Sequence, residues 1–450
     1  MTAKHQSFGR VFPAASALME PSEAARRLRD GRQRAGAMLA VGNMRSYGDS
    51  CLNSSGTIVD MRSMNRLVTF DTETGILEAE AGILLPEIIA TGAPHGFFPP
   101  VVPGTQFITL GGAIANDVHG KNHHRRGTFG RHVLWLDLMQ SDGQVRRLSP
   151  QDNTPLFAAT VGGMGMTGMI LRAAIRLMPV PSLDVAEKIE PFGSLDEFFA
   201  MAEEADAKNE YAVAWIDQLA GGRGAGRGLL LTGNHAEGGV RQALPPGGKL
   251  AVPFQPPLNM LNRPFLKAFN MAYRLAKGRR RDVAVSGYQG FFFPLDGVRD
   301  WNRLYGPSGL FQHQSVVPFA TAREAIPALF DAARKAGQGS FLTVLKRFGD
   351  LPSPGMLSFP RPGYTLTLDF PNRGKSTRAL LDQLDRITVE AGGAINPYKD
   401  ARMGTATFAA SFPRWREFEA LRDPAFVSDF WRRTALALSA SGTSLASAAE

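Results

Sequence analysis

The chain has 450 residues, 44% of them hydrophobic, which suffices to bury roughly one to three globular cores. No run of about 18 apolar residues occurs, residues 1–7 lack an apolar stretch, and Cys51 is the one cysteine, so we expect no membrane-spanning helix, secretory signal or internal disulfide. The net charge of +9 indicates an anionic partner, such as phosphate, a membrane surface or nucleic acid.

The first third of the chain alternates short strands with few helices. An amphipathic helix is expected over residues 21–35, opened by Ser22, and a strand at 38–41 runs directly into a polar loop. Further strands are expected over 57–61, 67–71, 76–80, 133–139 and 145–148, with a helix over 84–91. This pattern predicts an α+β fold, not a doubly wound parallel sheet.

Two glycine-bearing loops stand out in this region. The first is Val41-Gly-Asn-Met-Arg-Ser-Tyr-Gly-Asp49, and the second, within residues 99–122, contains Gly104, Thr105, Thr109, Gly111, Gly112 and Gly120. Glycine lets the backbone approach a ligand and present N–H groups to anionic oxygens. A tight turn with a buried Gly-Gly crossing would explain one such loop, but two together predict the two sides of a diphosphate site.

A GxGxxG pattern at residues 163–168 matches a dinucleotide-binding fingerprint. That fingerprint has meaning only between a strand and a helix. Here residues 155–160 are expected to be helical and residues 169–178 to form a strand, so the order is reversed. We therefore interpret the pattern as a turn of small residues.

From about residue 184 the pattern changes to that of a second, antiparallel sheet. A helix is expected over 195–207, a hairpin over 212–231, strands over 311–317, 341–347 and 364–370, and helices over 322–335 and 376–391. The strands roughly alternate, which predicts one polar face, and its side chains could line a cavity: Gln312, Gln314, Lys346, Thr365 and Thr367. The residues after about 395 are mostly helical and end in a tail expected to be frayed.

Residues 262–281 form a basic amphipathic segment. Asn262 is a suitable N-cap, and Gly278 a suitable end. Seven lysines or arginines and no acidic residue occur between Arg263 and Arg281. Such a helix suits an anionic membrane surface, although a solvated helix covering the second sheet would have the same pattern.

Several motifs resemble the flavin-binding domain of the vanillyl-alcohol oxidase superfamily. They are Arg45-Ser-Tyr-Gly-Asp49, Pro103-Gly-Thr105, Gly111-Gly-Ala-Ile-Ala115 and Asp117-Val-His-Gly-Lys-Asn-His-His124. Within that superfamily the chain is most similar to the decaprenylphosphoryl-β-D-ribose 2′-oxidase family. The similarity continues through residues 161–168, 301–307, 311–314, 341–349 and 399–402, and therefore spans most of the chain.

The resemblance implies a PCMH-type FAD-binding domain of two subdomains, residues 1–183 and 394–450, with a substrate domain inserted at 184–393. That domain would be built on an antiparallel sheet flanked by helices. The implied catalytic residues are Lys399, His119, Lys346, Gln314 and Tyr47. The implied cofactor-binding residues are Val41, Gly42, Asn43, Met44, Arg45, Ser46, Tyr47, Gly48, Asp49, Pro103, Gly104, Thr105, Thr109, Leu110, Gly111, Gly112, Asn116, Asp117, His119, Gly120, Ile170 and Asn396. Lys399 is the first choice for a catalytic contact and His119 the second, and either could be the base.

Three departures from the family pattern change what is expected. Arg45 stands where superfamily members with covalent flavin often carry histidine, so we expect noncovalent FAD. Thr367 replaces a cysteine near the flavin, so inhibitors that need that thiol should not react. Asn396 appears where the closest relatives carry tyrosine.

The reaction that the resemblance implies is oxidation of the C2′ hydroxyl of a polyprenyl-phosphoryl ribose to a ketone. A separate NAD(P)H-dependent keto-reductase would complete a 2′-epimerisation that serves cell-envelope polysaccharide synthesis. The alternatives are an alditol or aldonolactone oxidase that uses O2 on a soluble sugar, and a non-enzymatic basic protein that binds a membrane or nucleic acid. We expect a cytoplasmic enzyme, peripheral to the inner face of the membrane, with no nucleic-acid partner. We expect no metal either, because the histidines at 119, 123, 124 and 132 have no acidic or thiol ligand at a usual spacing.

Overall fold

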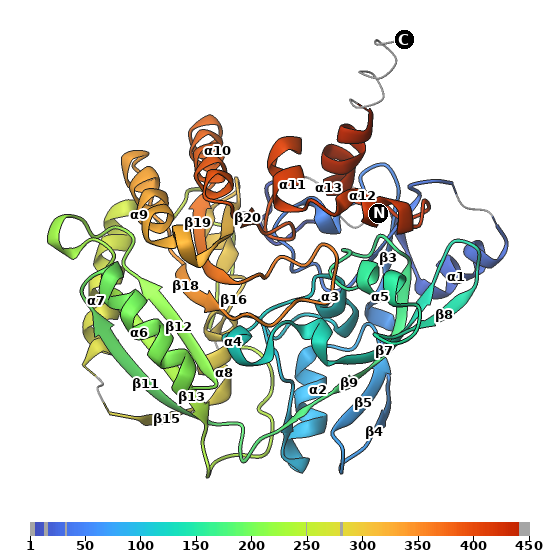
Figure 1. Cartoon of the computed structure of the whole chain (residues 1–450), viewed down its shortest axis with the longest axis horizontal. Helices are drawn as coiled ribbons and strands as arrows, with labels where there is room; N and C mark the ends of the chain where they lie inside the picture. Colours follow the sequence, from blue (N-terminus) through green and yellow to red (C-terminus); the bar gives the residue numbers. More distant parts are fainter. Residues whose placement is uncertain (1–4, 13–16, 32–33, 249, 280–281, 441–450) are drawn as a thin grey trace.

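The computed structural model describes residues 5–12, 17–31, 34–248, 250–279 and 282–440 (Figure 1). The tail expected to be frayed and the last two arginines of the basic segment lie outside the described residues. Within the described residues, no helix has the length and apolar character that crossing a membrane requires.

The N-terminal strands form two sheets (Figure 1). A parallel sheet has the order β1 (Ala17–Met19), β3 (Thr57–Asp60), β2 (Met38–Val41). An antiparallel sheet has the order β4 (Leu67–Phe70), β5 (Ile76–Glu80), β9 (Met169–Arg176), β7 (Val133–Met139), β8 (Val145–Leu148). Helices α2 (Leu85–Gly92), α3 (Leu110–Ala115) and α5 (Thr154–Thr160) bury Ile88, Ile114 and Phe157 against the antiparallel sheet. Shorter elements are α1 (Pro21–Arg29), α4 (His123–Arg126), β6 (Phe97–Phe98) and β10 (Met178–Pro179).

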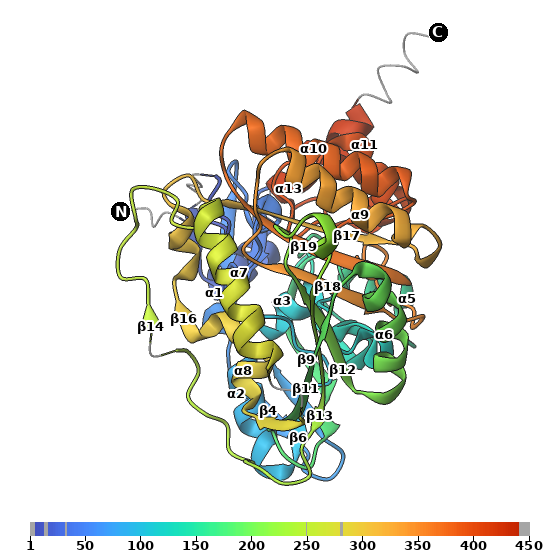
Figure 2. The same cartoon turned by 90° about the vertical axis from the view of Figure 1, so that its left-hand side faces the viewer.

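The chain then builds an eight-stranded antiparallel sheet, called here the large sheet. Its order is β15 (Ala284–Ser286), β11 (Val185–Phe192), β13 (Gly228–His235), β12 (Tyr211–Ile216), β18 (Thr343–Phe348), β19 (Gly363–Pro371), β17 (Leu310–Val317), β20 (Ala394–Ile395). Helices α6 (Leu195–Lys208), α9 (Phe319–Lys335) and α10 (Lys375–Glu390) bury Phe198, Ile326 and Leu384 on one face (Figure 1). Near β12 and β13, α7 (Arg263–Gly278) crosses the side of the molecule that Figure 2 turns to the viewer, beside α8 (Tyr288–Phe292), β14 (Leu250–Ala251) and β16 (Val298–Arg299).

The C-terminal segment returns to the N-terminal sheets. Its helices are α11 (Thr405–Ser411), α12 (Trp415–Leu421) and α13 (Asp429–Trp431), followed by a π-helical turn at Arg432–Leu436. Phe408, Phe418 and Trp431 share one core with Met164 and Met166. The Met38 backbone is hydrogen-bonded to both Ala425 and Val427, so residues nearly 400 positions apart lie side by side.

These sheets confirm the expected α+β class, and most element boundaries agree with the sequence to within a few residues. The helix expected to reach residue 35 ends at Arg29, because Gly31 takes a left-handed φ of 64°. The strands of the large sheet lie within residues 185–395, so β20 begins just past the expected boundary at 393. The division at 183 and 393 remains a prediction.

The polar face expected of β17, β18 and β19 lies over a cavity. Every residue of β17 and β19 is buried. Helices cover one face, and the polar face lies over a cavity shared with the N-terminal loops. Gln312, Gln314, Lys346 and Thr367 line that cavity, as the alternation predicted, whereas Thr365 does not.

Candidate active site

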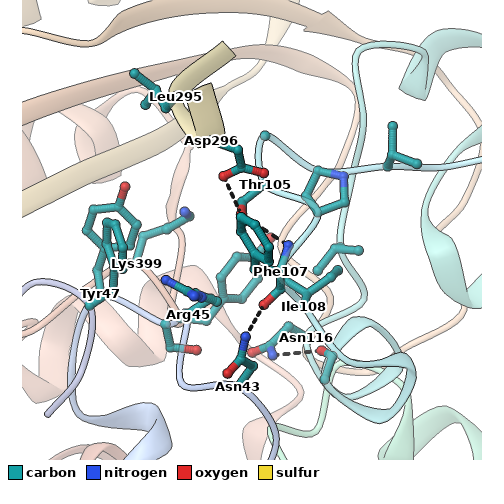
Figure 3. A pocket seen from close by; sticks show the side chains of 18 of the residues that line it. Asn43, Arg45, Tyr47, Thr105, Phe107, Ile108, Asn116, Leu295, Asp296 and Lys399 are labelled. Carbon is teal, nitrogen blue, oxygen red and sulfur yellow. Dashed lines mark hydrogen bonds between the residues drawn. The ribbon is translucent and has the colours of Figure 1, made fainter. Parts of the chain in front are cut away.

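A cavity of about 1270 Å³ lies between the two glycine loops and the uncovered face of the large sheet (Figure 3). Both loops line it, as do polar side chains of β17, β18 and β19 and the loop that carries Lys399. Its size is that of a site for a large cofactor together with a substrate.

Close backbone contact joins the two glycine loops. A Cβ atom on Gly42 would lie 2.1 Å from Thr109 Oγ1, so only glycine fits there. Asn43 Nδ2 donates to the Phe107 carbonyl at 2.9 Å, and Asn116 Nδ2 donates to the Gly112 carbonyl at 2.8 Å (Figure 3). The loops thus form one continuous wall with bare backbone toward the cavity.

Arg45 is the main cation of that wall. Its guanidinium lies 5.8 Å from the Phe8 ring centroid and 5.4 Å from that of Phe107, and its buried Nε has no hydrogen-bond partner. Burial lowers the pKa of Arg45, although the group stays cationic at neutral pH. Ser50 Oγ, also on the lining, is likewise buried without a partner. Unsatisfied donors beside a glycine-only cradle fit the diphosphate and ring of FAD.

Lys346, His119 and Gln314 form a hydrogen-bonded row opposite the loops. The Gln314 carbonyl accepts from Asn396 Nδ2 at 2.8 Å, so its amide nitrogen is the atom that donates to Thr365 Oγ1 and to His119 Nε2, at 3.1 and 3.0 Å. His119 Nε2 must therefore be the acceptor, and its Nδ1 carries the proton. Burial holds the pKa of His119 well below its usual range, in agreement with a neutral ring.

Lys346 is the titratable end of this row. Its Nζ lies 3.2 Å from His119 Nδ1 and donates to the Gly120 carbonyl at 3.4 Å. Burial lowers the pKa of Lys346 to about 7, and the charges of Lys121 and Lys399 add to the effect. This amine can therefore hold or release a proton near neutral pH.

Lys399 lies beside Tyr47 on the other side of the cavity. Its Nζ is 4.2 Å from the centre of the Tyr47 ring (Figure 3). Burial lowers the pKa of Lys399, and the charge of buried Asp369 opposes that shift. Asp369 in turn accepts from Gln312 Nε2 at 2.6 Å, and burial raises its pKa. The charge of Asp369 therefore favours the ammonium form of Lys399, which lines the cavity.

Most of the residues implied by the resemblance line this cavity. They are Val41, Gly42, Asn43, Met44, Arg45, Ser46, Tyr47, Pro103, Gly104, Thr105, Thr109, Gly111, Gly112, Asn116, His119, Gly120, Ile170, Gln314, Lys346 and Lys399. Gln312 and Thr367 line it too, whereas Thr365 lies behind Gln314. Cys51 also lines it, but burial raises its thiol pKa to about 12, as suits a small buried filler.

Five of the expected cofactor-binding residues lie outside the cavity lining: Gly48, Asp49, Leu110, Asp117 and Asn396. Asp49 pairs with Arg433, with Oδ2 2.7 Å from Nε. Asp117 accepts from Gly130 N at 2.8 Å and from Ser358 Oγ at 2.5 Å, which ties the loop after α3 to residues 349–362. Leu110 is a core residue, and a Cβ on Gly48 would collide with the Asp400 carbonyl. These contacts hold together the segments around the cavity.

Sequence reasoning missed many lining residues, among them Lys121, Asp296 and Phe8. Lys121 donates to the carbonyls of Phe291 and Phe292 at 2.6 and 3.1 Å. Asp296 accepts from Thr105 Oγ1 and from Gln106 N, both at 2.8 Å, so it joins the second glycine loop to the inserted segment (Figure 3). Phe8 packs on Tyr47 with ring centroids 5.1 Å apart. Lys121 could have been predicted from the sequence, because it follows His119 in the same motif. Asp296 and Phe8 do not belong to any motif that indicates a site.

Among the side chains that the structure describes, no group of three or more His, Cys, Asp and Glu residues is arranged to hold a metal ion. His123 and His132 have other partners: His123 Nδ1 accepts from Gly349 N at 3.2 Å, and His132 Nε2 lies 3.0 Å from the Arg126 carbonyl. These histidines therefore join segments of the fold.

Comparison with known proteins agrees with this geometry. Residues 17–149 match a family described as an FAD binding domain. Decaprenylphosphoryl-beta-D-ribose oxidase of Mycolicibacterium smegmatis is 34% identical over 97% of this chain and 98% of its own. An uncharacterised protein of Streptomyces coelicolor is also 34% identical, over 76% of this chain and 97% of its own, and L-gulonolactone oxidase of Mus musculus is 29% identical over 33% of each.

Proposed function

The chain belongs to the decaprenylphosphoryl-β-D-ribose oxidase family of FAD-dependent oxidoreductases, and from this we propose that it oxidises the C2′ hydroxyl of a polyprenyl-phosphoryl-β-D-ribose to the 2′-ketone. The observation that carries the proposal is one cavity in which an FAD cradle faces the row of Lys346, His119 and Gln314. Bound FAD supplies the hydride acceptor. The cradle holds the cofactor noncovalently, since Arg45 cannot form the link that a histidine forms.

In this proposal the protein moves the hydroxyl proton. The neutral Lys346 amine would take the proton from the C2′ hydroxyl, and its Nζ would become an ammonium. His119, fixed by Gln314, orients Nζ. Lys399 remains charged through its Asp369 partner and stabilises the negative charge that develops on the oxygen or on the substrate phosphate.

The product chemistry supports a second enzyme. A 2′-ketone that is reduced from the opposite face gives the epimeric alcohol, so an NAD(P)H-dependent keto-reductase is the partner that would complete a 2′-epimerisation. That step needs no residue of this chain.

The surface around α7 supports contact with an anionic membrane. Met271 and Leu275 on the helix are 58% and 52% exposed, and Phe254 and Leu258 nearby are 68% and 73% exposed. The same helix carries Lys267, Arg274 and Lys277 and no acidic residue. A surface that combines exposed apolar and basic side chains binds the headgroup region of anionic lipid. Co-sedimentation with anionic vesicles should fall for Met271→Ser with Leu275→Ser, whereas Val145→Ser, on the edge strand β8, should leave it unchanged.

The reaction is tested by an absorption spectrum. We expect flavin bands in the purified protein that bleach when a polyprenyl-phosphoryl ribose is added without oxygen. Lys399→Ala should slow the bleaching by about 100-fold, since it removes the positive charge at the reacting oxygen. Bands that persist with this substrate but bleach with a soluble alditol or aldonolactone would replace the proposal with the alternative of a soluble-sugar oxidase.

A further inference from the structure

The cavity face of the large sheet changes from polar to apolar in one direction across the strands. Gln314 on β17 lies opposite Thr367 on β19, which lies opposite Val344 on β18. Val344 lies opposite Trp215 on β12, which lies opposite Leu229 on β13. Neighbouring strands are about 4.8 Å apart, so the change from amide to indole spans about 14 Å.

A second row repeats this order. Thr365 on β19 lies opposite Lys346 on β18, and farther along the sheet Val213 on β12 lies opposite Leu231 on β13. Val213, Trp215, Leu231 and Val344 line the cavity together with Leu342. Both rows thus place apolar side chains of the large sheet next to the proposed reaction centre.

Helix α7 covers these apolar side chains. The Tyr273 ring lies 5.0 Å from that of Trp215, and Tyr273 also lines the cavity. The other side of the same helix exposes Met271 and Leu275. The apolar part of the cavity, called here the apolar lane (Val213, Trp215, Leu231, Tyr273, Leu342 and Val344), therefore runs under a helix whose outer side is itself apolar.

A cation lies where the polar and apolar parts meet. Lys121 lines the cavity, and its charge acts on Lys346, which is on the polar side. The Lys121 carbonyl accepts from Ala212 N at 3.0 Å, which places this residue beside the start of β12, next to Val213. Glu187 is the carboxylate that lines the apolar end of the cavity, and its Oε2 accepts a hydrogen bond from Ser286 Oγ at 2.7 Å.

We propose that the apolar lane binds the first isoprene units of a polyprenyl-phosphate tail, with the phosphate at Lys121. The order of the chemistry along the sheet, from hydrogen-bonding groups through the Lys121 ammonium to apolar side chains, is the order of a sugar, a phosphate and a prenyl chain. Met271 and Leu275 continue that order toward lipid, so the rest of the tail leaves under α7. This inference rests on the proposed function for its sugar end, but the lane itself requires only a prenyl phosphate.

The test uses two soluble probes, farnesyl phosphate with three isoprene units and isopentenyl phosphate with one, with binding measured by calorimetry on the FAD-loaded protein. Farnesyl phosphate should bind at least about tenfold more tightly, since the lane removes its extra apolar surface from water. Trp215→Ala should abolish that difference, and Leu231→Ala, a smaller truncation of the same lane, should reduce it. Trp135→Ala is the matched control, because this tryptophan packs on Arg147 away from the cavity.

Equal affinity of the two probes for the native protein would overturn the inference, as would a difference that survives in both lane variants. Neither result depends on turnover. If the probes behave as expected but no polyprenyl-phosphoryl ribose bleaches the flavin, the lane stands and the proposed reaction fails.

Discussion

The Lys346 amine, 3.2 Å from His119 Nδ1, makes the proposed reaction sensitive to pH near neutrality. Burial lowers the pKa of Lys346 to about 7, so the amine is neutral above that pH and protonated below it. An amine can accept a proton only in its neutral form, so the rate of flavin reduction should rise with pH through about 7 and then level off.

Rapid-mixing absorption measurements of flavin reduction across pH check this expectation. Lys346→Arg, which stays charged, should lose about 100-fold in rate on the plateau above pH 7 and should lack the rise. Lys335→Met at the end of α9 should keep the profile. A rise that persists unshifted in Lys346→Arg would exclude Lys346 as its source.

Gly42 provides a test of the cofactor cradle. In Gly42→Ala the new Cβ would meet Thr109 Oγ1 at 2.1 Å, and the two loops would have to separate. We expect about tenfold weaker FAD binding or worse, measured by titrating the apoprotein and following flavin fluorescence. Gly238→Ala, where nothing lies within 4 Å, should bind FAD normally.

Sequence alone predicted the residues around the cavity better than it predicted their roles. The glycines and Lys399 stand in motifs, so their place could be expected from their order. Asn396 could not be placed, since its amide turns to the Gln314 carbonyl through a contact between segments 82 positions apart. Asp296 is a lone acidic residue in an irregular segment, and only the folded chain brings it to Thr105.

At the scale of elements, the π-helical turn at Arg432–Leu436 connects two parts of the site. Through Arg433 it joins the first glycine loop to the segment that carries Lys399. Arg433 Nη2 donates to Asp49 Oδ1 at 2.9 Å and to Asp400 Oδ2 at 2.7 Å. Arg433→Ala leaves two buried carboxylates without their cation, and we expect unfolding to become easier by about 3 kcal/mol. Denaturant unfolding measures this change. Arg414→Ala removes an exposed pair with Glu417 and should cost at most about 1 kcal/mol.

The elements themselves were largely predictable because their periodicity is local. β5, β7 and β8 have the bounds that alternation and turn residues indicate. Asn262 caps α7 as expected, with Oδ1 accepting from Phe265 N at 3.1 Å. The polar face of β17 and β19 could be predicted from alternation, whereas the N-terminal loops that share its cavity are distant in sequence.

At the scale of the whole molecule, the N-terminal segment joins the two sides of the cavity. Phe8 N donates to the Ser46 carbonyl at 2.9 Å, Asn302 Nδ2 donates to the Phe8 carbonyl at 2.8 Å, and Leu310 N donates to the Gly9 carbonyl at 2.8 Å. The Phe8 ring lies between Tyr47 and Trp301, at 5.1 and 5.5 Å.

Phe8→Ala should therefore weaken the contact between the two sides. We expect a loss of about 2 kcal/mol in unfolding free energy and faster proteolysis between them, since a partly buried ring is removed. Thermal unfolding and timed digestion measure both effects. Phe254→Ala removes a ring that is 68% exposed and should change stability by no more than about 0.5 kcal/mol. Equal effects of the two variants would show that the N-terminal segment does not couple the two sides.

The return of the C-terminal segment determines the order in which the molecule can be completed during synthesis. The strands of the large sheet come from residues 185–395, so the sheet can close before residues 405–436 leave the ribosome. The core around Met164 and Met166 needs Phe408, Phe418 and Trp431, and β2 needs Ala425 and Val427. The N-terminal sheets are therefore made first and finished last, and the FAD cradle is complete only once Arg433 has paired with Asp49.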